Sequence, residues 1–471
     1  MQFWTLTHPD GAPATIDART GTVRTYAKLR ADVARIQSAL PDLGRKSLGL
    51  LLARNSYECL TVYLAALNSG NALILLDASL NPELLNEFLD TYQPDWIFTP
   101  EPALPGYQPS PSQEPGLMIA SQLRDLDLHP DLALLLNTSG STGSPKLVRL
   151  TLANLQANAA SIAEYLELTP AERPITSLPM PYSYGLSVIN SHLLAGASIV
   201  LSEDSVLRRE FWDAIDRHAC TSVAGVPYTY QLLLQAGLLT KRGASLKTLT
   251  QAGGKLDETS IRKMLAISEI RGWRFFVMYG QTEATARISY VPADRLSEKV
   301  GSVGIAIPNG TLSTDDQTGE LLYSGPNVML GYAESRADLS KGDELHGTLR
   351  TGDLARIDTD GFAYITGRLK RFLKLFGKRF NLDDVESVLA RHIASPIACF
   401  GSDDLLQIAV EDSSTSDDVR EMVCKLFDLP RTAVCVTAVT ALPRTANGKL
   451  NYQALTQNLI DAAQVATAAT R

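Results

Sequence analysis

Short apolar runs alternate with longer amphipathic stretches along most of the chain. The runs include Leu48–Leu52, Ala72–Leu76, Trp96–Thr99, Leu132–Leu136, Ala197–Leu201 and Phe275–Met278. Between two of them, apolar residues recur at the spacing of one helical face: Leu152, Leu155, Ala159, Ile162 and Leu166. Strands that alternate with helices are typical of layered α/β folds whose strands are largely parallel. The pattern therefore predicts a fold of the α/β class.

The character of the sequence changes twice along the chain. Between about Val300 and Thr366, short apolar runs are separated by Gly, Asp and Asn, which predicts a β-rich subdomain. A chain of 471 residues exceeds one ordinary domain. We predict a large N-terminal domain, residues 1–367, of layered α/β subdomains plus the β-rich subdomain, and a small α+β C-terminal domain, residues 368–471. Residues 101–116 are rich in proline and are predicted to form a surface loop.

Composition narrows the class of protein. The formal net charge is −8, whereas general nucleic-acid binders are basic, so we expect no nucleic-acid partner. No apolar run approaches the ~18–20 residues that span a bilayer, and the N-terminal residues lack the pattern of a signal peptide. The 5 cysteines lie far apart and form no CxxC pair, which fits a reducing compartment. We therefore expect a cytoplasmic enzyme that makes no membrane contact.

A loop rich in glycine and hydroxyl groups follows the apolar run that begins at Leu132. It comprises Thr138, Ser139, Gly140, Ser141, Thr142, Gly143 and Ser144, and it is followed by Pro145 and Lys146. Small residues leave backbone N–H groups free to point at an anion, while hydroxyl groups and a lysine add donors and charge. The spacing differs from the GxxxxGK[ST] pattern of P-loops. The loop is predicted to bind a polyphosphate; a flexible linker is the structural alternative.

Five further motifs follow this loop along the chain. They are LPMPYSYGLS (Leu178–Ser187), QAGGKL (Gln251–Leu256), YGQTEAT (Tyr279–Thr285), TGDLARIDTDGFAYITGR (Thr351–Arg368) and PRTANGK (Pro443–Lys449). Together with TSGSTGSPK, they resemble in order the motifs of the adenylate-forming superfamily: acyl-CoA synthetases, adenylation domains of peptide synthetases and firefly-type luciferases. The resemblance extends over nearly the whole chain.

The resemblance implies an ATP-dependent ligase that converts a carboxylic acid to acyl-AMP and then to a thioester, with ATP and Mg²⁺ as cofactors. Such catalysis consists mostly of positioning two anions and neutralising their charge. Glu283 is the implied Mg²⁺ ligand and Thr282 the implied donor to the α-phosphate. The other implied nucleotide contacts are the loop above with Lys146, and Gly253, Gly254, Tyr279, Gly280, Gln281, Asp353 and Arg368. A partly buried acid, a turn aspartate after a strand and a solvated arginine are the structural alternatives for Glu283, Asp353 and Arg368.

Two lysines of the C-terminal segment have implied roles in catalysis. The resemblance places Lys449 against the reacting oxygens during adenylation, where an ammonium offsets developing charge. It places Lys370 at a hinge about which the small domain rotates between the two half-reactions. A turn lysine and a solvated lysine are the structural alternatives.

The substrate pocket implied by the resemblance includes Tyr182, Tyr184 and Gly185. No acidic residue lies between Leu178 and Leu194, which disfavours an α-amino acid substrate. Arg287 is expected to border the same pocket, where an unpaired charge is costly. The hypothesis is that it pairs with a second carboxylate or a strong acceptor of the substrate; an ion pair at the surface is the alternative.

The thiol acceptor stays open between CoA and the phosphopantetheine of an acyl carrier protein. The loop after Cys399 is short compared with that of relatives, and Arg368–Arg379 contains six basic residues and no acidic one. This run suits an acidic carrier surface, or it is a solvated basic strand. Adenylate formation with another outcome, and a relative that binds nucleotide without catalysis, are the alternative functions.

Overall fold

The computed structural model describes residues 1–99, 104–124, 127–137, 146–369, 371–375, 378–390, 392–393, 395–402, 405–411, 416–427, 429–445 and 450–459. The chain forms two compact units. Unit 1 comprises Met1–Leu312 and Tyr323–Leu349, and unit 2 comprises Ser313–Leu322 and Arg350–Arg471. The predicted domain boundary at residues 367 and 368 stays a prediction.

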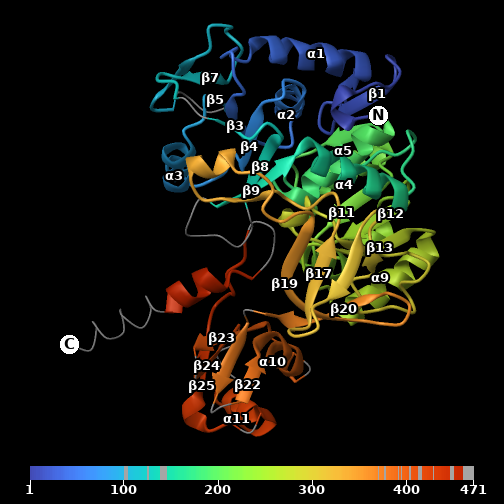
Figure 1. Ribbon diagram of the computed structural model, residues 1–471. Helices are drawn as coiled ribbons and strands as arrows, with labels where there is room; N and C mark the ends of the chain where they lie inside the picture. The colour runs from blue at the N-terminus through green and yellow to red at the C-terminus, as the bar shows by residue number, and fades with distance from the viewer. Residues whose placement is uncertain are drawn as a thin grey trace. The chain divides into compact units, whose positions relative to one another are not determined.

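An eight-stranded sheet is the largest element of unit 1 (Figure 1). Its strands, in order across the sheet, are β18 (Gly331–Ala333), β9 (Leu147–Thr151), β8 (Leu132–Asn137), β4 (Ala72–Asp77), β3 (Leu48–Ala53), β5 (Trp96–Phe98), β7 (Leu117–Ala120) and β6 (Tyr107–Pro109). The inner strands β8, β4, β3 and β5 are parallel, and the outer pairs are antiparallel. The sheet is therefore mixed rather than mainly parallel.

Both faces of this sheet are buried, which explains the continuous apolar runs of its inner strands. Alternate residues of β3 separate into two cores: Leu51 belongs to one, while Leu50 and Leu52 belong to the other. The first core is completed by α1 (Tyr26–Ala39), α2 (Tyr57–Asn68), α4 (Leu152–Tyr165) and α5 (Ser183–Ala195), and the second by α3 (Pro82–Tyr92). Helix α4 starts directly after β9, where Thr151 and Asn154 form a capping box.

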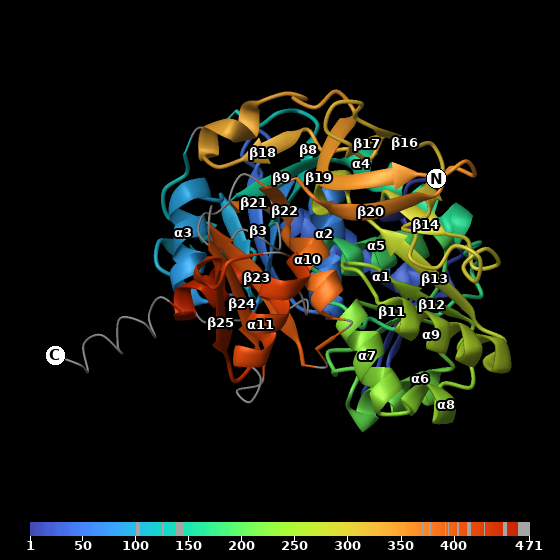
Figure 2. The ribbon, with the colours of Figure 1, turned by 90° about the horizontal axis from the view of Figure 1, so that it is seen from below.

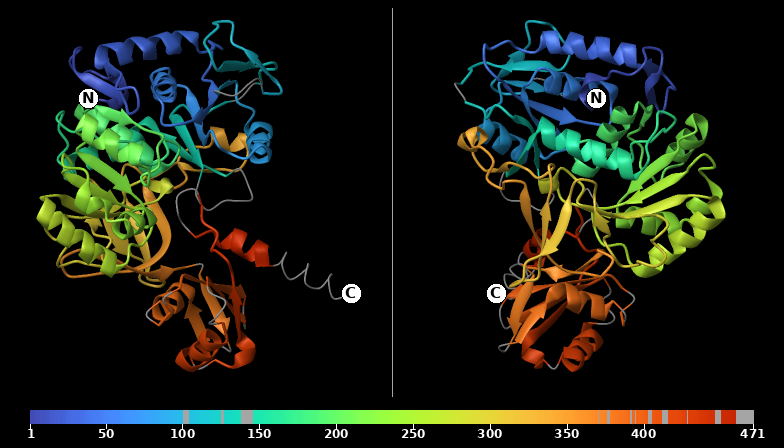
Figure 3. Two further views of the ribbon diagram at one scale, coloured as in Figure 1. Left: turned by 180° about the vertical axis from the view of Figure 1, so that it is seen from behind. Right: turned by 45° about the vertical axis from the view of Figure 1, so that its right-hand side comes forward.

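A second sheet of unit 1 has the order β11 (Ser222–Gly225), β12 (Thr248–Gln251), β13 (Arg274–Tyr279), β14 (Ser289–Val291) and β15 (Ile305–Ala306). Figure 2 shows α6 (Arg209–His218), α7 (Pro227–Gln235), α8 (Leu238–Lys241) and α9 (Glu258–Arg271) beside β11–β13, and Figure 3 shows the same layer from two further sides. A small sheet joins β10 (Ile199–Leu201), β1 (Pro13–Asp17) and β2 (Val23–Thr25). The 3-10 helices η1 (Phe3–Thr5), η2 (Thr282–Ala284) and η3 (Arg336–Ser340) complete the unit.

A four-stranded sheet has the order β16 (Thr311–Thr314), β17 (Glu320–Ser324), β19 (Thr348–Ile357) and β20 (Ala363–Arg368). Unit 2 contains the hairpin of β21 (Phe372–Leu375) and β22 (Lys378–Asn381) and the sheet of β23 (Ile397–Ser402), β24 (Leu405–Val410) and β25 (Val434–Ala438). Helices α10 (Leu382–Leu389) and α11 (Ser416–Phe427) and the 3-10 helix η5 (Arg431–Ala433) accompany this sheet, and residues 452–459 are helical.

Arg371 joins several elements of unit 2, although it belongs to the run that sequence analysis took as one basic surface. Its guanidinium contacts Asp383 and donates to Glu386, to the hydroxyl of Tyr452 and to the carbonyl of Cys399. Burial alone would lower the pKa of Arg371, but the hydrogen bond and charge of Glu386 raise it. Arg371 therefore stabilises unit 2 from within, and only part of the basic run is available to a partner.

The α/β class is confirmed, as is each of the six predicted strands, with ends that differ by one or two residues. The surface loop predicted for residues 101–116 is partly wrong, because Tyr107–Pro109 forms β6 and pairs with β7. Proline disfavours strands but is tolerated at sheet edges, and β6 is an edge strand. Asp353 was expected after a strand and lies inside β19.

Candidate active site

A tight turn follows β13 and carries the YGQTEAT motif. Gly280 starts it, and a Cβ at this position would overlap the carbonyl oxygen of Ala286, so only glycine fits. Thr285 and Ala286 have φ angles of 56° and 119°, a backbone region that side chains other than glycine rarely adopt. Such strain persists only where the surroundings hold it.

Asn327 holds this turn in place. Its Nδ2 donates to the carbonyl oxygens of Ala284 and Arg287 at 2.7 and 2.8 Å, and its own carbonyl accepts from the hydroxyl of Thr285. Its Oδ1 accepts from the hydroxyl of Tyr323 at 2.7 Å. Asn327 is buried and fully engaged, so it fixes where Thr282 and Glu283 point.

Glu283, Tyr332 and Lys146 form a continuous contact. The Tyr332 hydroxyl donates to Oε1 of Glu283 at 2.8 Å, and Nζ of Lys146 lies 3.8 Å from the centre of the Tyr332 ring. Lys146 also pairs with Glu334 at 3.0 Å; because Glu334 is largely exposed, this pair is weak and can be exchanged for another anion. Burial, and then the charge of Glu283, raises the pKa of Tyr332, so its hydroxyl remains a donor at neutral pH.

The topology explains why these three side chains meet. Strands β8 and β9 pair antiparallel, with Asn137 opposite Leu147, and Lys146 directly precedes β9. Strand β18 pairs with β9 and places Tyr332 opposite Val148. The backbone N–H of Met329, just before β18, donates to the carbonyl of Glu283.

Glu283 suits a Mg²⁺ ion that is also held by phosphate oxygens. Tyr332 engages only Oε1, which leaves the second carboxylate oxygen available among the described residues. Mg²⁺ is usually bound by one or two carboxylates together with substrate phosphates. Within the described part of the chain, no group of three His, Cys, Asp or Glu side chains could hold a metal by itself.

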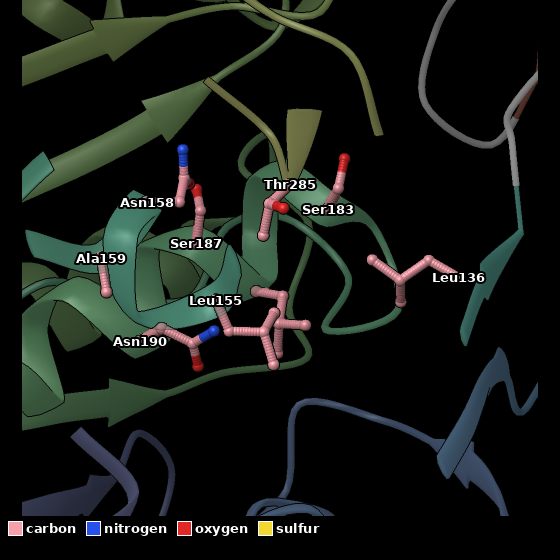
Figure 4. A pocket seen from close by; sticks show the side chains of 9 residues that line it. Leu136, Leu155, Asn158, Ala159, Ser183, Ser187, Asn190 and Thr285 are labelled. Carbon is pink, nitrogen blue, oxygen red and sulfur yellow. The ribbon is translucent and has the colours of Figure 1, made fainter. Parts of the chain in front are cut away.

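Thr282 lies against the start of α5. Its hydroxyl is 3.2 Å from that of Ser183, and the two belong to the YGQTEAT and LPMPYSYGLS motifs. Figure 4 shows a small pocket here, whose wall combines polar side chains with apolar ones; the polar residues are Asn158, Ser183, Ser187, Asn190 and Thr285. The structure thus brings together two motifs that lie far apart in the sequence.

The third motif meets the same region. A Cβ at Gly253, whose φ is 89°, would overlap the hydroxyl of Tyr182, so this glycine permits a close approach. A Cβ at Gly254 would lie 3.2 Å from the ring of Pro227. The carbonyl oxygen of Gly254 accepts a hydrogen bond from Nε2 of Gln251. Gln281 donates to the hydroxyl of Tyr279 at 3.1 Å.

The predicted pocket residues differ in what they contact. Tyr184 is buried, and its hydroxyl bonds to the carbonyl of Thr250 at 2.8 Å. Gly185 lies within α5, where a Cβ would overlap the carbonyl of Pro179, so close packing requires this glycine. Arg287 is buried and lies over the Tyr184 ring, 4.1 Å from its centre. The surface ion pair considered for Arg287 is therefore excluded.

Asp353 and Arg368 lie together in unit 2. They are directly opposite in the pairing of β19 with β20, and Nε of Arg368 donates to Oδ1 of Asp353 at 3.0 Å. Asp353 is buried, whereas the Arg368 side chain is mostly exposed. A carboxylate beside an exposed guanidinium is suited to bind vicinal hydroxyl groups.

Eight predicted site residues lie outside the described residues: Thr138, Ser139, Gly140, Ser141, Thr142, Gly143, Lys370 and Lys449. Sequence analysis missed Tyr332 and Asn327. The Tyr332 contact depends on the pairing of β18 with β9, which joins segments far apart in the chain. No local signal in the sequence marks either residue.

A model of the AMP-binding enzyme family matches residues 2–333. The chain belongs to this family. It is 29% identical over 405 residues to a feruloyl-CoA synthase of Amycolatopsis, an alignment that covers 80% of each chain. It is 30% identical over 340 residues to a sulfoacetate–CoA ligase of Cupriavidus necator, covering 68% of this chain and 65% of that one.

Solved structures of this family share the fold. The O-succinylbenzoate coenzyme A synthetase of Bacillus subtilis in complex with AMP matches with a TM-score of 0.76 and 22% identity, covering 96% of this chain and 97% of that one. The predicted family and fold class are therefore confirmed. No helix in the described part of the chain is long and apolar enough to cross a membrane.

Proposed function

We propose that this chain is an ATP-dependent acid–thiol ligase that works through an acyl-adenylate. The observation that carries the proposal is the contact of Glu283, Tyr332 and Lys146 at the end of the β8–β9 hairpin. In this contact a hard oxygen ligand, Glu283, lies close to an exchangeable cation, Lys146, which directly follows the predicted phosphate loop in the sequence. Membership of the AMP-binding family and the CoA ligases among the relatives support the same reaction.

In the first step, a carboxylate oxygen of the acid bonds to the α-phosphorus of ATP as the bond to pyrophosphate breaks. Thr282 is assigned as a donor to the α-phosphate, and Lys146 as a charge that offsets the phosphates. Glu283 would hold Mg²⁺, which would neutralise phosphate charge. Asp353 and Arg368 are assigned to the ribose, and the segments of Gly253 and Tyr279 to the adenine. In the second step, a thiol sulfur bonds to the acyl carbon, AMP leaves, and the thiol proton is released.

CoA is the proposed acceptor, because the relatives named above are CoA ligases. An acyl carrier protein is a second candidate, favoured by the short connection between β23 and β24, which end and begin at Ser402 and Leu405. We also propose that the enzyme acts in the cytoplasm, since all five cysteines are free.

ATP–pyrophosphate exchange with a panel of carboxylic acids tests the first step. At least one acid is expected to support exchange, and Glu283→Gln is expected to abolish most of it. Exchange that no acid supports would contradict the proposal. Adding CoA, or a carrier protein with its phosphopantetheine arm, to the best acid then identifies the acceptor from the thioester that forms.

A further inference from the structure

A second cavity lies in unit 1 between α4, α5, β11 and β12. Its volume is about 20 Å³, which is room for about one water molecule. Most of its wall is apolar, but Arg287, His192 and Glu172 also line it, and Glu172 accepts from the hydroxyl of Thr221 at 2.6 Å. The function proposed above uses neither His192 nor the cavity itself.

Arg287 brings a positive charge to this cavity, and Glu172, which lines the same cavity, forms no ion pair with it. The side chain is 2% exposed, and its Nε donates to the hydroxyl of Tyr165 at 3.3 Å. Among the described residues, neither terminal nitrogen of the guanidinium has a hydrogen-bond partner, and no carboxylate pairs with it. The Tyr184 ring supplies a cation–π contact that offsets part of the cost of burial. The terminal nitrogens remain as donors.

His192 brings an acceptor to the same cavity. Its Nδ1 lies 2.8 Å from the carbonyl oxygen of Val188, and because a carbonyl only accepts, Nδ1 carries the hydrogen. Burial lowers the pKa of His192 to about 4, so the ring is neutral and Nε2 holds a lone pair. This buried Nε2 has no hydrogen-bond partner in the described structure. Buried polar atoms without partners are rare and point to a missing ligand or water.

One chemical group satisfies both residues. A hydroxyl oxygen accepts from the Arg287 guanidinium while its proton goes to Nε2 of His192. A carboxylate would pair with Arg287 but has no proton to donate to Nε2 of His192, and it would add a second carboxylate to a cavity that Glu172 already lines. The cavity also has room for about one oxygen atom rather than two. Size and hydrogen-bonding pattern therefore favour a hydroxyl over the second carboxylate expected from the sequence.

We propose that this cavity receives a hydroxyl group at the far end of the acyl substrate, so that the preferred acids carry a hydroxyl remote from the reacting carboxyl. The inference rests on the proposed adenylation. Helix α5 sets the length of the acid, because its first residue, Ser183, contacts Thr282, and His192 lies nine positions later. At 1.5 Å per residue, these positions are about 13 Å apart along the axis. Acids of intermediate length fit this span, whereas very short ones do not.

Pairs of acids that differ only in the hydroxyl test the proposal. The pairs are 4-hydroxycinnamate with cinnamate, 3-(4-hydroxyphenyl)propionate with 3-phenylpropionate, and 8-hydroxyoctanoate with octanoate; suberate adds a terminal carboxylate. In ATP–pyrophosphate exchange, the hydroxylated member of at least one pair is expected to have a ~10- to 100-fold higher kcat/KM. His192→Leu and Arg287→Leu should reduce this preference to within about twofold while exchange with the plain acid persists.

A matched variant, and the ratio of kcat/KM between the two acids of a pair, distinguish a loss of hydroxyl recognition from a folding defect. His218→Leu removes another half-buried histidine of unit 1, which bonds to Ala18 rather than to the cavity, and should leave the preference unchanged. A folding defect lowers exchange with both members of a pair and leaves their ratio intact.

Three results would overturn the inference. Equal use of both members of every pair means that the cavity holds an ordered water only, and adenylation stands. Preference for suberate restores the carboxylate hypothesis. Exchange with none of the acids contradicts the hydroxyl inference, and if the wider panel also fails, it contradicts the proposed function.

Discussion

Tyr332 links two side chains that the sequence assigns to separate motifs. Its ring lies under Lys146, which follows the phosphate loop, and its hydroxyl bonds to Glu283, the proposed Mg²⁺ ligand. A single residue can therefore orient the carboxylate relative to the cation, as the proposed binding of both to the phosphates of ATP requires. We regard Tyr332 as a positioning residue rather than a catalytic one.

Tyr332→Phe should keep the ring and remove the hydrogen bond to Glu283. A bond to a charged group contributes ~1.5–3 kcal/mol, so we expect kcat/KM for ATP to fall about 10-fold or more and half-saturation to need more Mg²⁺. Steady-state exchange over a range of Mg²⁺ concentrations measures both effects. The matched control is Tyr364→Phe, whose ring lies against Arg356 in unit 2 and which should leave both values unchanged. A Mg²⁺ dependence identical to wild type would remove Tyr332 from this role.

His192 makes stability depend on pH. Its pKa is about 4 in the folded protein and near 6.5 when unfolded, so the unfolded state binds more protons between these values. Stability is therefore fully present above pH 6.5 and is lost as the pH falls toward 4. The charged groups that share its cavity are Glu172 and Arg287.

Between pH 7 and pH 5, wild type should lose about 2 kcal/mol more stability than His192→Leu. Denaturant unfolding of both proteins at the two pH values measures this difference. Because the other titrating groups are shared, they cancel in the comparison. Parallel losses in the two proteins would contradict the buried neutral state of His192.

At the scale of elements, the turn after β13 shows what a sequence motif contains and what it omits. The motif includes Gly280, Thr282 and Glu283, and the close approach of Ala286 explains why a glycine is needed. It does not include Asn327, which lies over forty positions later and still supplies the bonds that hold the turn. Local residues specify the shape of the turn, whereas its support comes from a tertiary contact that periodicity cannot reveal.

Asn327→Asp tests whether the hydrogen bonds of Asn327 hold the turn after β13, because the two side chains have nearly the same shape. The carboxylate cannot donate to the carbonyls of Ala284 and Arg287, and it buries a charge. We expect a loss of ~2–4 kcal/mol in stability and a fall in adenylation at temperatures where the variant remains folded. Asn309→Asp, at an exposed turn with φ of 65°, should cost less than ~0.5 kcal/mol. Wild-type adenylation by a folded Asn327→Asp would show that the turn holds itself.

At the scale of the whole chain, the alternation of apolar runs with amphipathic stretches predicted the α/β class and the inner strands, because buried parallel strands are continuous apolar runs. It failed at the edge strand β6, where proline hides a strand that only pairing with β7 creates. The pattern of charges also misled for Arg371. The run of basic residues predicted a side chain that faces solvent or a partner, whereas its guanidinium bonds to Glu386 inside unit 2. Pairing and burial depend on distant segments, so neither could be deduced from local sequence.

The two half-reactions make different demands on the chain, and Lys449 should distinguish them. The residue lies outside the described residues, in a segment assigned to unit 2, whereas Thr282 and Glu283 belong to unit 1. Its proposed role is to offset the charge that develops while the carboxylate bonds to the α-phosphorus and pyrophosphate leaves, a transfer that is complete once acyl-AMP has formed. Lys449→Ala should therefore lower ATP–pyrophosphate exchange ~100-fold or more, as loss of a charge-stabilising donor does. Conversion of supplied acyl-AMP to the thioester should stay within about threefold of wild type, because no bond to phosphorus forms or breaks in that step and the proposed role of Lys449 is confined to the first step. Both rates are measured on the same preparation, so a general folding defect would lower them together. Equal losses in the two rates, or exchange at the wild-type rate, would refute a role confined to the first step.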